Sequence, residues 1–217
     1  MPTPFLAPAF NLPAVLLLGF SFAALNARKT SGLFAAYTGQ SLTLAACMAI
    51  LGLDAHDPIL LVLALLNALG KGFAVPWILR RRLRRELLDQ TEFSAYLSPP
   101  AAFVAAAVLL VLAFVLLPGA AAGSRHFLLV AGLAALFWSL AAAASRREAL
   151  PQVLSLFLGE NGVILGLLAL ISGFSLLAEM SLFLDLWLLA LVAGILVRRM
   201  YQRLGHTDVS KLNNLRG

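Results

Sequence analysis

Four ionisable residues of this chain lie within or at the edge of long apolar segments, namely Lys71, Glu160, Glu179 and Asp185. A charged side chain at the centre of a bilayer costs about 2.5–3.5 kcal/mol to insert, so such residues face protein or water and usually mark a pathway for ions or protons. Glu179 lies at the outer edge of its segment, where a solvated end residue is the simpler interpretation. Lys71 and Glu160 could also neutralise each other as a static interhelical pair, and the sequence leaves both hypotheses open.

The residues around Lys71 suggest a specialised helix. Asn67 precedes Lys71 by one helical turn, so that an amide and an ammonium share one face. Gly70 and Gly72 flank the lysine, and Pro76 follows. Because proline removes a backbone donor, we expect the helix to bend near Gly72, and a break beside a charge could admit water.

The other two central acids also have suggestive neighbours. Glu160 is followed by Gly162 and Gly166, a spacing that permits close approach of another helix. Ser181 precedes Asp185 by one turn. Counting from the ends of the apolar segments places Lys71, Glu160 and Asp185 at a similar depth near the midplane.

The composition requires a membrane around these residues. The chain has 217 residues, of which 61% are hydrophobic and only 12% are charged, with a mean hydropathy of +0.93. A soluble domain of this size could not bury so much apolar surface in one core, which excludes a water-soluble enzyme. The length allows six to eight spans of about 20 residues each and no sizeable soluble domain.

Apolar runs that are separated by charged residues predict an all-α, polytopic membrane protein with seven transmembrane helices. The expected spans are 8–27, 33–53, 58–79, 101–117, 127–145, 150–171 and 178–197.

The basic residues predict the orientation of these spans. Of the 16 Lys and Arg residues, all but Lys71 and Arg125 lie in alternate loops and the C-terminal tail. By the positive-inside rule, the N-terminus should lie outside and the C-terminus in the cytoplasm. The net charge of +6 therefore reflects topology, and no nucleic-acid partner is expected.

One loop, residues 80–97, combines arginines with leucines near one helical face. It predicts an amphipathic helix on the cytoplasmic surface, with its arginines near anionic lipid. A docking strip for a peripheral subunit is the alternative. The single cysteine, Cys47, and the placement of all three histidines in loops or the tail argue against an iron–sulfur cluster or a bis-histidine haem in this chain.

The C-terminal part, residues 124–217, resembles the small K subunit of bacterial respiratory complex I and the related C subunit of multisubunit cation/proton antiporters. The matching features are Arg146-Arg147 before a span with Glu160, and Asp185 in the next span before Arg198-Arg199. A short tail ending in NNLRG follows. The N-terminal part, residues 1–123, adds four spans and the Lys71 environment, and the whole chain is similar to the E subunit of hydrogenase-4 type complexes.

This resemblance implies a non-catalytic membrane subunit of a redox-driven proton or sodium pump, related to group 4 [NiFe] hydrogenases and formate hydrogenlyases. Glu160 matches a glutamate on the proton axis of complex I, and Asp185 stands where a second glutamate would be. The chain itself would hold no cofactor or metal. Nickel–iron and iron–sulfur centres would lie in peripheral redox partners, and the membrane partners would be antiporter-like large subunits and a quinone-site-like subunit.

Two other hypotheses stay open. The chain could be a purely structural assembly subunit of such a membrane arm or of an antiporter-type complex. It could also be an independent carrier or membrane enzyme, which would be active alone. The sequence does not identify the electron donor, and it does not decide between H⁺ and Na⁺.

Overall fold

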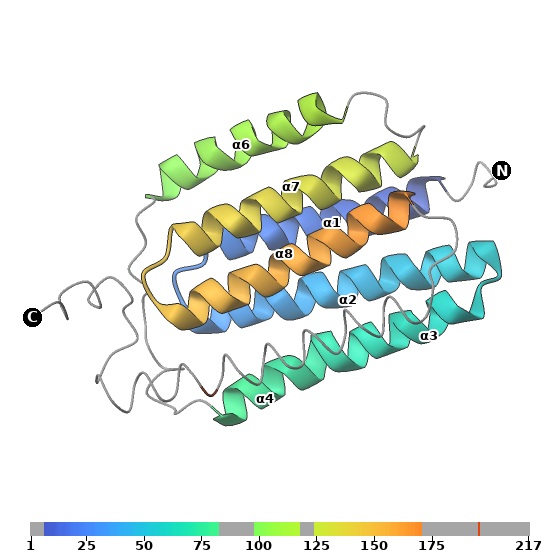
Figure 1. Cartoon of the computed structure of the whole chain (residues 1–217), viewed down its shortest axis with the longest axis horizontal. Coiled ribbons are helices and arrows are strands. Elements are labelled where there is room, and N and C mark those ends of the chain that lie inside the picture. Colours follow the sequence, from blue (N-terminus) through green and yellow to red (C-terminus); the bar gives the residue numbers. More distant parts are fainter. Residues whose placement is uncertain (1–6, 83–97, 118–123, 171–194, 196–217) are drawn as a thin grey trace, which may run out of the picture.

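The computed structural model of this chain describes residues 7–82, 98–117, 124–170 and 195, and these residues are almost entirely helical (Figure 1). The described residues form six helices, because the three consecutive elements between Pro58 and Arg82 continue one another as a single helical rod. The elements are α1 (Ala7–Asn26), α2 (Thr30–Ala55), α3 (Pro58–Asn67), the π-helix η1 (Ala68–Ala74), α4 (Val75–Arg82), α6 (Pro99–Leu116), α7 (Ser124–Ala144) and α8 (Ala149–Leu170).

The all-α prediction is confirmed for the described residues, and each of the first six predicted spans coincides with a helix to within a few residues. Four helices are long and apolar enough to cross a membrane, and α1 and α6 contain shorter apolar stretches. The four lie at Thr30–Ala55, Pro58–Arg81, Arg125–Ala144 and Ala149–Leu170. Apart from Ile195, the predicted seventh span lies outside the described residues, and so does most of the amphipathic loop.

The turn between α2 and α3 follows from local sequence. His56 ends α2 in the left-handed conformation, with φ of 51°. The Asp57 carboxylate accepts a hydrogen bond from the Ile59 backbone N–H at 2.9 Å, and Pro58 occupies the first helical position. An acidic N-cap followed by proline satisfies the free N–H groups of a helix start, so the chain reverses within a few residues.

The helices lie side by side, with α7, α8, α1 and α2 in the middle of the assembly (Figure 1). Helix α6 packs on α7 and α1, and the α3–η1–α4 rod packs on α2. The α1–α2 turn, the α7–α8 turn and the end of α4, which all carry arginines, lie at one end of the molecule (Figure 1, left). By the positive-inside rule, basic turns of a multi-pass membrane protein lie on one side of the membrane, and a shared end satisfies that requirement.

Glycine allows α7 and α8 to meet at backbone distance. A Cβ atom added to Gly132 of α7 would lie 2.5 Å from the Gly166 nitrogen and 2.6 Å from the Gly162 oxygen of α8. A Cβ atom on Gly162 would lie 2.8 Å from the Gly132 oxygen. Gly162 and Gly166, where the sequence predicts close helix approach, therefore lie at this contact, and Gly132 is the partner that the sequence did not identify.

The buried interior around α2, the α3–η1–α4 rod and α8 forms three layers along the helix axes. One apolar cluster, here called the basic-end cluster, includes Phe34 of α2, Leu79 of α4 and Leu154 of α8. The opposite cluster, here called the far cluster, includes Met48 of α2 and Leu165 of α8. Buried polar side chains lie between the two along α1, α2, the α3–η1 rod and α8: Ser21, Gln40, Ser41, Asn67, Lys71 and Asn161. We call these six residues the polar layer.

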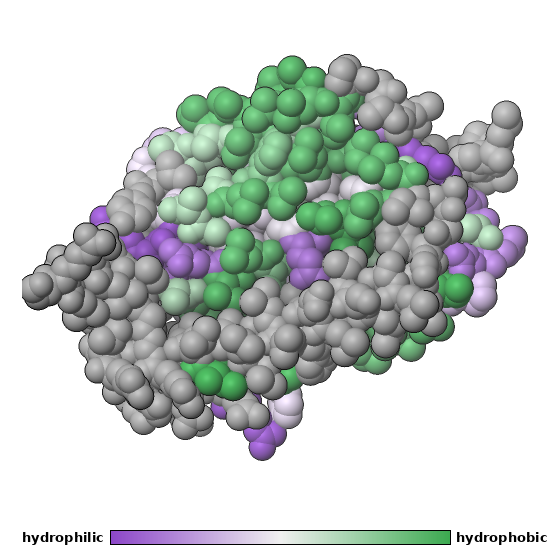
Figure 2. Space-filling view, in the orientation of Figure 1, coloured by the Kyte–Doolittle hydropathy of each residue, from purple (hydrophilic) through white to green (hydrophobic). Residues whose placement is uncertain are grey.

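The outer surface of the helices is strongly apolar. Figure 2 shows hydrophobic residues covering much of the visible described surface, with hydrophilic residues mainly toward the two ends. Large side chains of α6 such as Phe103 and Val115 are about two-thirds exposed, at 64% and 66%. Such a surface needs lipid or apolar partners around it, in agreement with a multi-pass membrane protein.

Candidate functional site

Lys71 of η1 and Glu160 of α8 form a direct ion pair in the middle of the helix assembly. The Lys71 Nζ atom lies 2.5 Å from Glu160 Oε1. The lysine side chain is 2% exposed, whereas the glutamate side chain is 22% exposed. The pair therefore has one enclosed partner and one partly accessible partner.

The π-helix positions the lysine. Helix η1 spans Ala68–Ala74 and ends immediately before Val75 and Pro76. We expected a bend near Gly72, and the interruption takes the form of this π-helical stretch. π-Helical turns are rare and frequently lie at functional sites. Gly72 faces Leu42 closely, because an added Cβ atom would lie 3.0 Å from Leu42 Cδ2.

Amide side chains hold the helices in register around the pair. Asn161, the residue after Glu160, donates from Nδ2 to Gln40 Oε1 at 3.1 Å and to Ser41 Oγ at 2.9 Å. Gln40 in turn donates to Ser21 Oγ at 2.8 Å, which continues the network into α1. These hydrogen bonds join α8, α2 and α1 at the depth of the ion pair.

Asn67, one of the predicted second-line residues, joins the same layer from α3. Its Nδ2 atom donates to the backbone oxygen of Ser41 at 2.8 Å. Asn67 therefore anchors the α3–η1 rod to α2, while Lys71 connects the same rod to α8. The two residues work together at one depth, although their hydrogen bonds go to different helices.

Asn161 Oδ1 is a fully buried oxygen that has no hydrogen-bond partner within the described residues. Tyr37 is one turn before Ser41 on α2, and its ring packs on Phe157 of α8 with 6.0 Å between ring centroids. The charge of Glu160 also acts on Tyr37. Buried polar atoms without partners are uncommon and call for a functional explanation.

Arg146, which the sequence places in a loop, is buried. It lies in the α7–α8 turn and is only 2% exposed. Its guanidinium donates hydrogen bonds to the backbone oxygens of Ala24 and Ala27 at the C-terminal end of α1. Burial lowers the pKa of Arg146 to about 10, with Glu148 opposing and Arg28 adding to this shift. The guanidinium is therefore charged at neutral pH and neutralises the negative end of the helix dipole.

The structure brings together Lys71, Glu160 and Asn67 among the predicted site residues, and it adds Tyr37, Gln40, Ser41 and Asn161. Asp185, Ser181 and Glu179 lie outside the described residues, so their roles stay predictions. Polar residues inside otherwise apolar segments were the available sequence clue to Gln40 and Asn161. His126, expected in a loop, lies in the first turn of α7 and stacks obliquely on Phe114.

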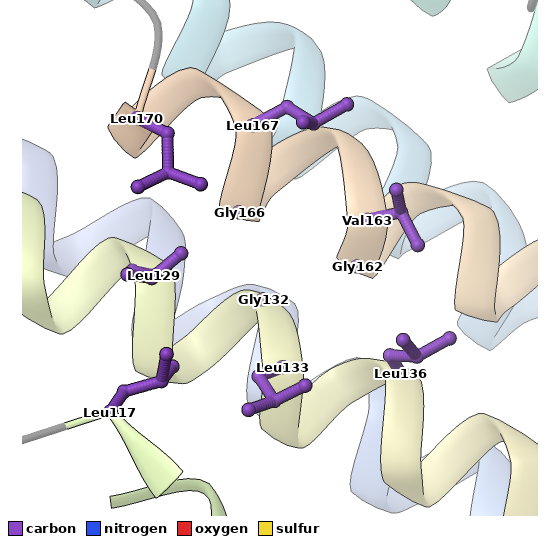
Figure 3. A pocket seen from close by; sticks show the side chains of 10 residues that line it. All are labelled: Leu117, Leu129, Gly132, Leu133, Leu136, Gly162, Val163, Gly166, Leu167 and Leu170. Carbon is purple, nitrogen blue, oxygen red and sulfur yellow. The ribbon is translucent and has the colours of Figure 1, made fainter. Parts of the chain in front are cut away.

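A second feature, an open apolar groove between α7 and α8, does not include the ion pair (Figure 3). Leucine side chains and glycine backbone form most of its wall, with Gly132, Gly162 and Gly166 at the base of the helix contact. It has no polar group that could orient a polar ligand, so it does not extend the candidate site.

Comparison of the chain with models of known protein families, with curated proteins and with solved structures gives no match.

Proposed function

We propose that this chain is a non-catalytic membrane subunit of a complex I-related, redox-driven ion-translocating complex, of the hydrogenase-4 or formate hydrogenlyase type. Lys71 and Glu160 would form part of its ion pathway, and Asp185 would continue that pathway. The observation that carries the proposal is the 2.5 Å pair between a buried ammonium and a partly accessible carboxylate at mid-span.

The energetic cost of the pair favours a functional role. Placing two charges in an apolar interior has a desolvation penalty that their attraction offsets only partly, so apolar residues of similar size would often stabilise the fold as well or better. Ionisable groups within spanning segments are accordingly uncommon outside ion and proton pathways.

The surroundings of the pair favour proton exchange. The basic-end cluster and the far cluster lie on either side of the polar layer along the helix axes. The Glu160 side chain is nevertheless 22% exposed. A carboxylate that lies between apolar clusters but is partly accessible is suited to exchange a proton with an ionisable residue of a neighbouring membrane subunit.

The redox chemistry is assigned to partners with nickel–iron and iron–sulfur centres, and the apolar outer surface suits contact with antiporter-like and quinone-site-like membrane subunits. We place the complex in the cytoplasmic membrane of a bacterium or archaeon. The N-terminus would lie outside, and the basic turns and C-terminus would lie in the cytoplasm.

The second candidate function is a purely structural subunit of the same kind of membrane arm. The hydrogen bonds among Ser21, Gln40, Asn161, Ser41 and Asn67 support it, because they join four helical rods without requiring any group to change its protonation. In that case the Lys71–Glu160 pair would be one more fixed contact.

The deciding experiment replaces Glu160 with Gln in cells that express the complete complex. Glutamine preserves the size and hydrogen bonding of the side chain but removes its titration. We expect the complex to assemble, as judged by purification through a tag on this chain, while proton uptake per electron in membrane vesicles falls at least severalfold. Asp54→Asn, which neutralises an exposed acid at the end of α2, is the matched control and should pump normally. Unchanged proton uptake in Glu160→Gln would instead favour the structural function.

A further inference from the structure

We propose that the apolar groove between α7 and α8 binds one acyl chain of an anionic phospholipid, and that Arg125 at the start of α7 holds the lipid phosphate. Helix α7 begins at the end of the molecule opposite the basic turns (Figure 1), so the lipid would belong to the outer leaflet in the proposed topology. The proposal goes beyond the proposed function, and its test uses no redox or transport activity.

The side chains that line the groove are all hydrocarbon. Leu133 of α7 and Leu167 of α8 lie on either side of the open space between the two helices (Figure 3). The groove has a volume of about 200 Å³, smaller than the roughly 300–1,000 Å³ of pockets for drug-sized ligands. A ring that carries carbonyl or hydroxyl groups would lose hydrogen bonds on entry, because no polar side chain lines the groove. An acyl chain is narrow and has no polar group, so it suits both the size and the chemistry.

The direction of the groove also suits an acyl chain. Its α7 wall runs from Leu129 to Leu136, a length of about 10 Å at about 1.5 Å per residue. Helices that span a membrane are tilted by only about 20° on average from the bilayer normal, which is also the direction in which acyl chains extend. A chain that follows the groove from the start of α7 therefore keeps its ordinary orientation in the leaflet.

A third helix suits the groove less well, because the glycines at its base are already used in the α7–α8 contact. A Cβ atom on Gly132 would lie 2.5 Å from the Gly166 nitrogen, and one on Gly162 would lie 2.8 Å from the Gly132 oxygen. Another backbone therefore cannot pack on these glycines in the way that small residues of spanning helices usually permit. The outer edge of the groove consists of larger side chains, with Val163 40% and Leu170 55% exposed.

Arg125 supplies charge complementarity for a phosphate at the end of the groove. It precedes Leu129 by four residues and Gly132 by seven, so it lies on the same face of α7 as the groove wall. One helical turn, about 6 Å along the axis, separates it from Leu129. Arg125 is exposed and lies in the first turn of α7, where the helix dipole also attracts an anion. A guanidinium can donate two parallel hydrogen bonds to one phosphate.

Arg125 is also the exception in the charge distribution of the chain. The other 15 Lys and Arg residues are Lys71 inside a span and 14 residues on the predicted cytoplasmic side. The positive-inside rule gives a basic residue on the opposite side no role in orientation. Contact with a lipid phosphate gives Arg125 a role that its place at the end of the groove can fulfil.

Photo-crosslinking in vesicles tests the proposal. The full-length chain, with any subunits that accompany it in purification, is reconstituted into vesicles of phosphatidylcholine and phosphatidylglycerol. Two probes with the same diazirine-bearing acyl chain are compared, one with a phosphatidylglycerol and one with a phosphatidylcholine headgroup, and labelled residues are mapped by mass spectrometry. We expect the groove to be labelled severalfold more by the anionic probe. The exposed face of α6, for example Val108 at 59% exposure, should be labelled equally by both.

Variants separate the headgroup contact from the groove itself. Arg125→Gln should reduce the preference for the anionic probe in the groove to the level seen on α6, whereas Arg125→Lys should keep most of it. Val163→Trp fills the groove from its exposed edge and should lower labelling of Leu129 and Leu133 severalfold by either probe. Val108→Trp on α6 is the matched control and should leave groove labelling unchanged.

Three results would overturn the proposal. Equal labelling of the wild-type groove by both probes would mean that bulk lipid fills it without recognition of the headgroup. A groove that neither probe labels, beside a labelled α6, would mean that protein covers it. A preference for the anionic probe that persists in Arg125→Gln would place the phosphate at another residue. The comparison of the two probes in wild type decides the first two points even if a variant is too unstable to reconstitute.

Discussion

Lys71 and Glu160 are 89 residues apart in sequence, yet their charged atoms lie 2.5 Å apart between η1 and α8. The contact joins the N-terminal and C-terminal parts of the chain in the middle of their helices. Its consequences for stability differ from its consequences for ion transfer, and variants can separate the two.

Removal of one partner of the pair should be more damaging than removal of both. Lys71→Met leaves the Glu160 charge without its buried partner, and we expect a loss of about 3–5 kcal/mol in the free energy of unfolding. The double variant Lys71→Met/Glu160→Gln should recover most of that loss. Thermal unfolding of the detergent-solubilised complex is the measurement. A double variant as unstable as the single one would mean that the charges themselves hold the helices together.

The α7–α8 contact should tolerate a methyl group at one glycine and not at another. Gly132→Ala would push its Cβ atom against the α8 backbone, and we expect a destabilisation of about 1–3 kcal/mol. Gly166→Ala is the matched control, because its Cβ atom would meet only Leu129 Cδ1, at 3.8 Å. Chemical denaturation of both variants measures the difference, and equal stability would contradict this packing.

The amide network should contribute to stability through Asn161. Asn161→Ala removes two hydrogen bonds and leaves Gln40 Oε1 buried without its donor, which should cost about 1–3 kcal/mol. Asn26→Ala removes an amide that bonds only to the Phe22 backbone oxygen of its own helix, so it should have a much smaller effect. Thermal unfolding measures the loss of stability in each variant, and the loss in Asn161→Ala should be much larger than the loss in Asn26→Ala.

Arg146 should anchor the α7–α8 turn to the end of α1. Arg146→Gln removes the charge and the guanidinium group that donates to the Ala24 and Ala27 backbone oxygens. We expect the free energy of unfolding to fall by about 2 kcal/mol. The pKa of Arg146 in the folded state, about 10, lies below the ordinary value of 12.5, so folding disfavours protonation of this group. The free energy of unfolding should therefore rise with pH only above about pH 10. The effect of Arg146→Gln should therefore be constant between about pH 6 and pH 9, and a strong pH dependence in that range would contradict this assignment.

The predicted seven-span topology can be tested without further structural information. Reporter fusions after Gly119 and after Gly217 should report opposite sides of the membrane, with the second fusion in the cytoplasm. The reason is that nearly all basic residues outside the spans fall on the side of the C-terminal tail. The same side for both fusions would contradict the odd number of spans expected between these two points.

The sequence alone determined the helical segments. In a bilayer each segment must satisfy its backbone hydrogen bonds internally, so an apolar run of sufficient length dictates a helix almost regardless of its neighbours. For this reason the first six predicted spans agree with the helices, and Lys71 and Glu160 stood out as costly exceptions. The close approach at Gly162 and Gly166 was also predictable, because small residues one turn apart form a local pattern.

The tertiary structure alone decided which polar groups meet. Hydropathy describes depth along a helix and does not specify which side chains of different helices face each other. The pairing of Lys71 with Glu160 depends on packing across η1, α2 and α8, and on a π-helical stretch where we expected only a bend. The burial of Arg146 likewise follows from a turn that packs against the end of α1, a contact between residues about 120 positions apart that no local pattern encodes.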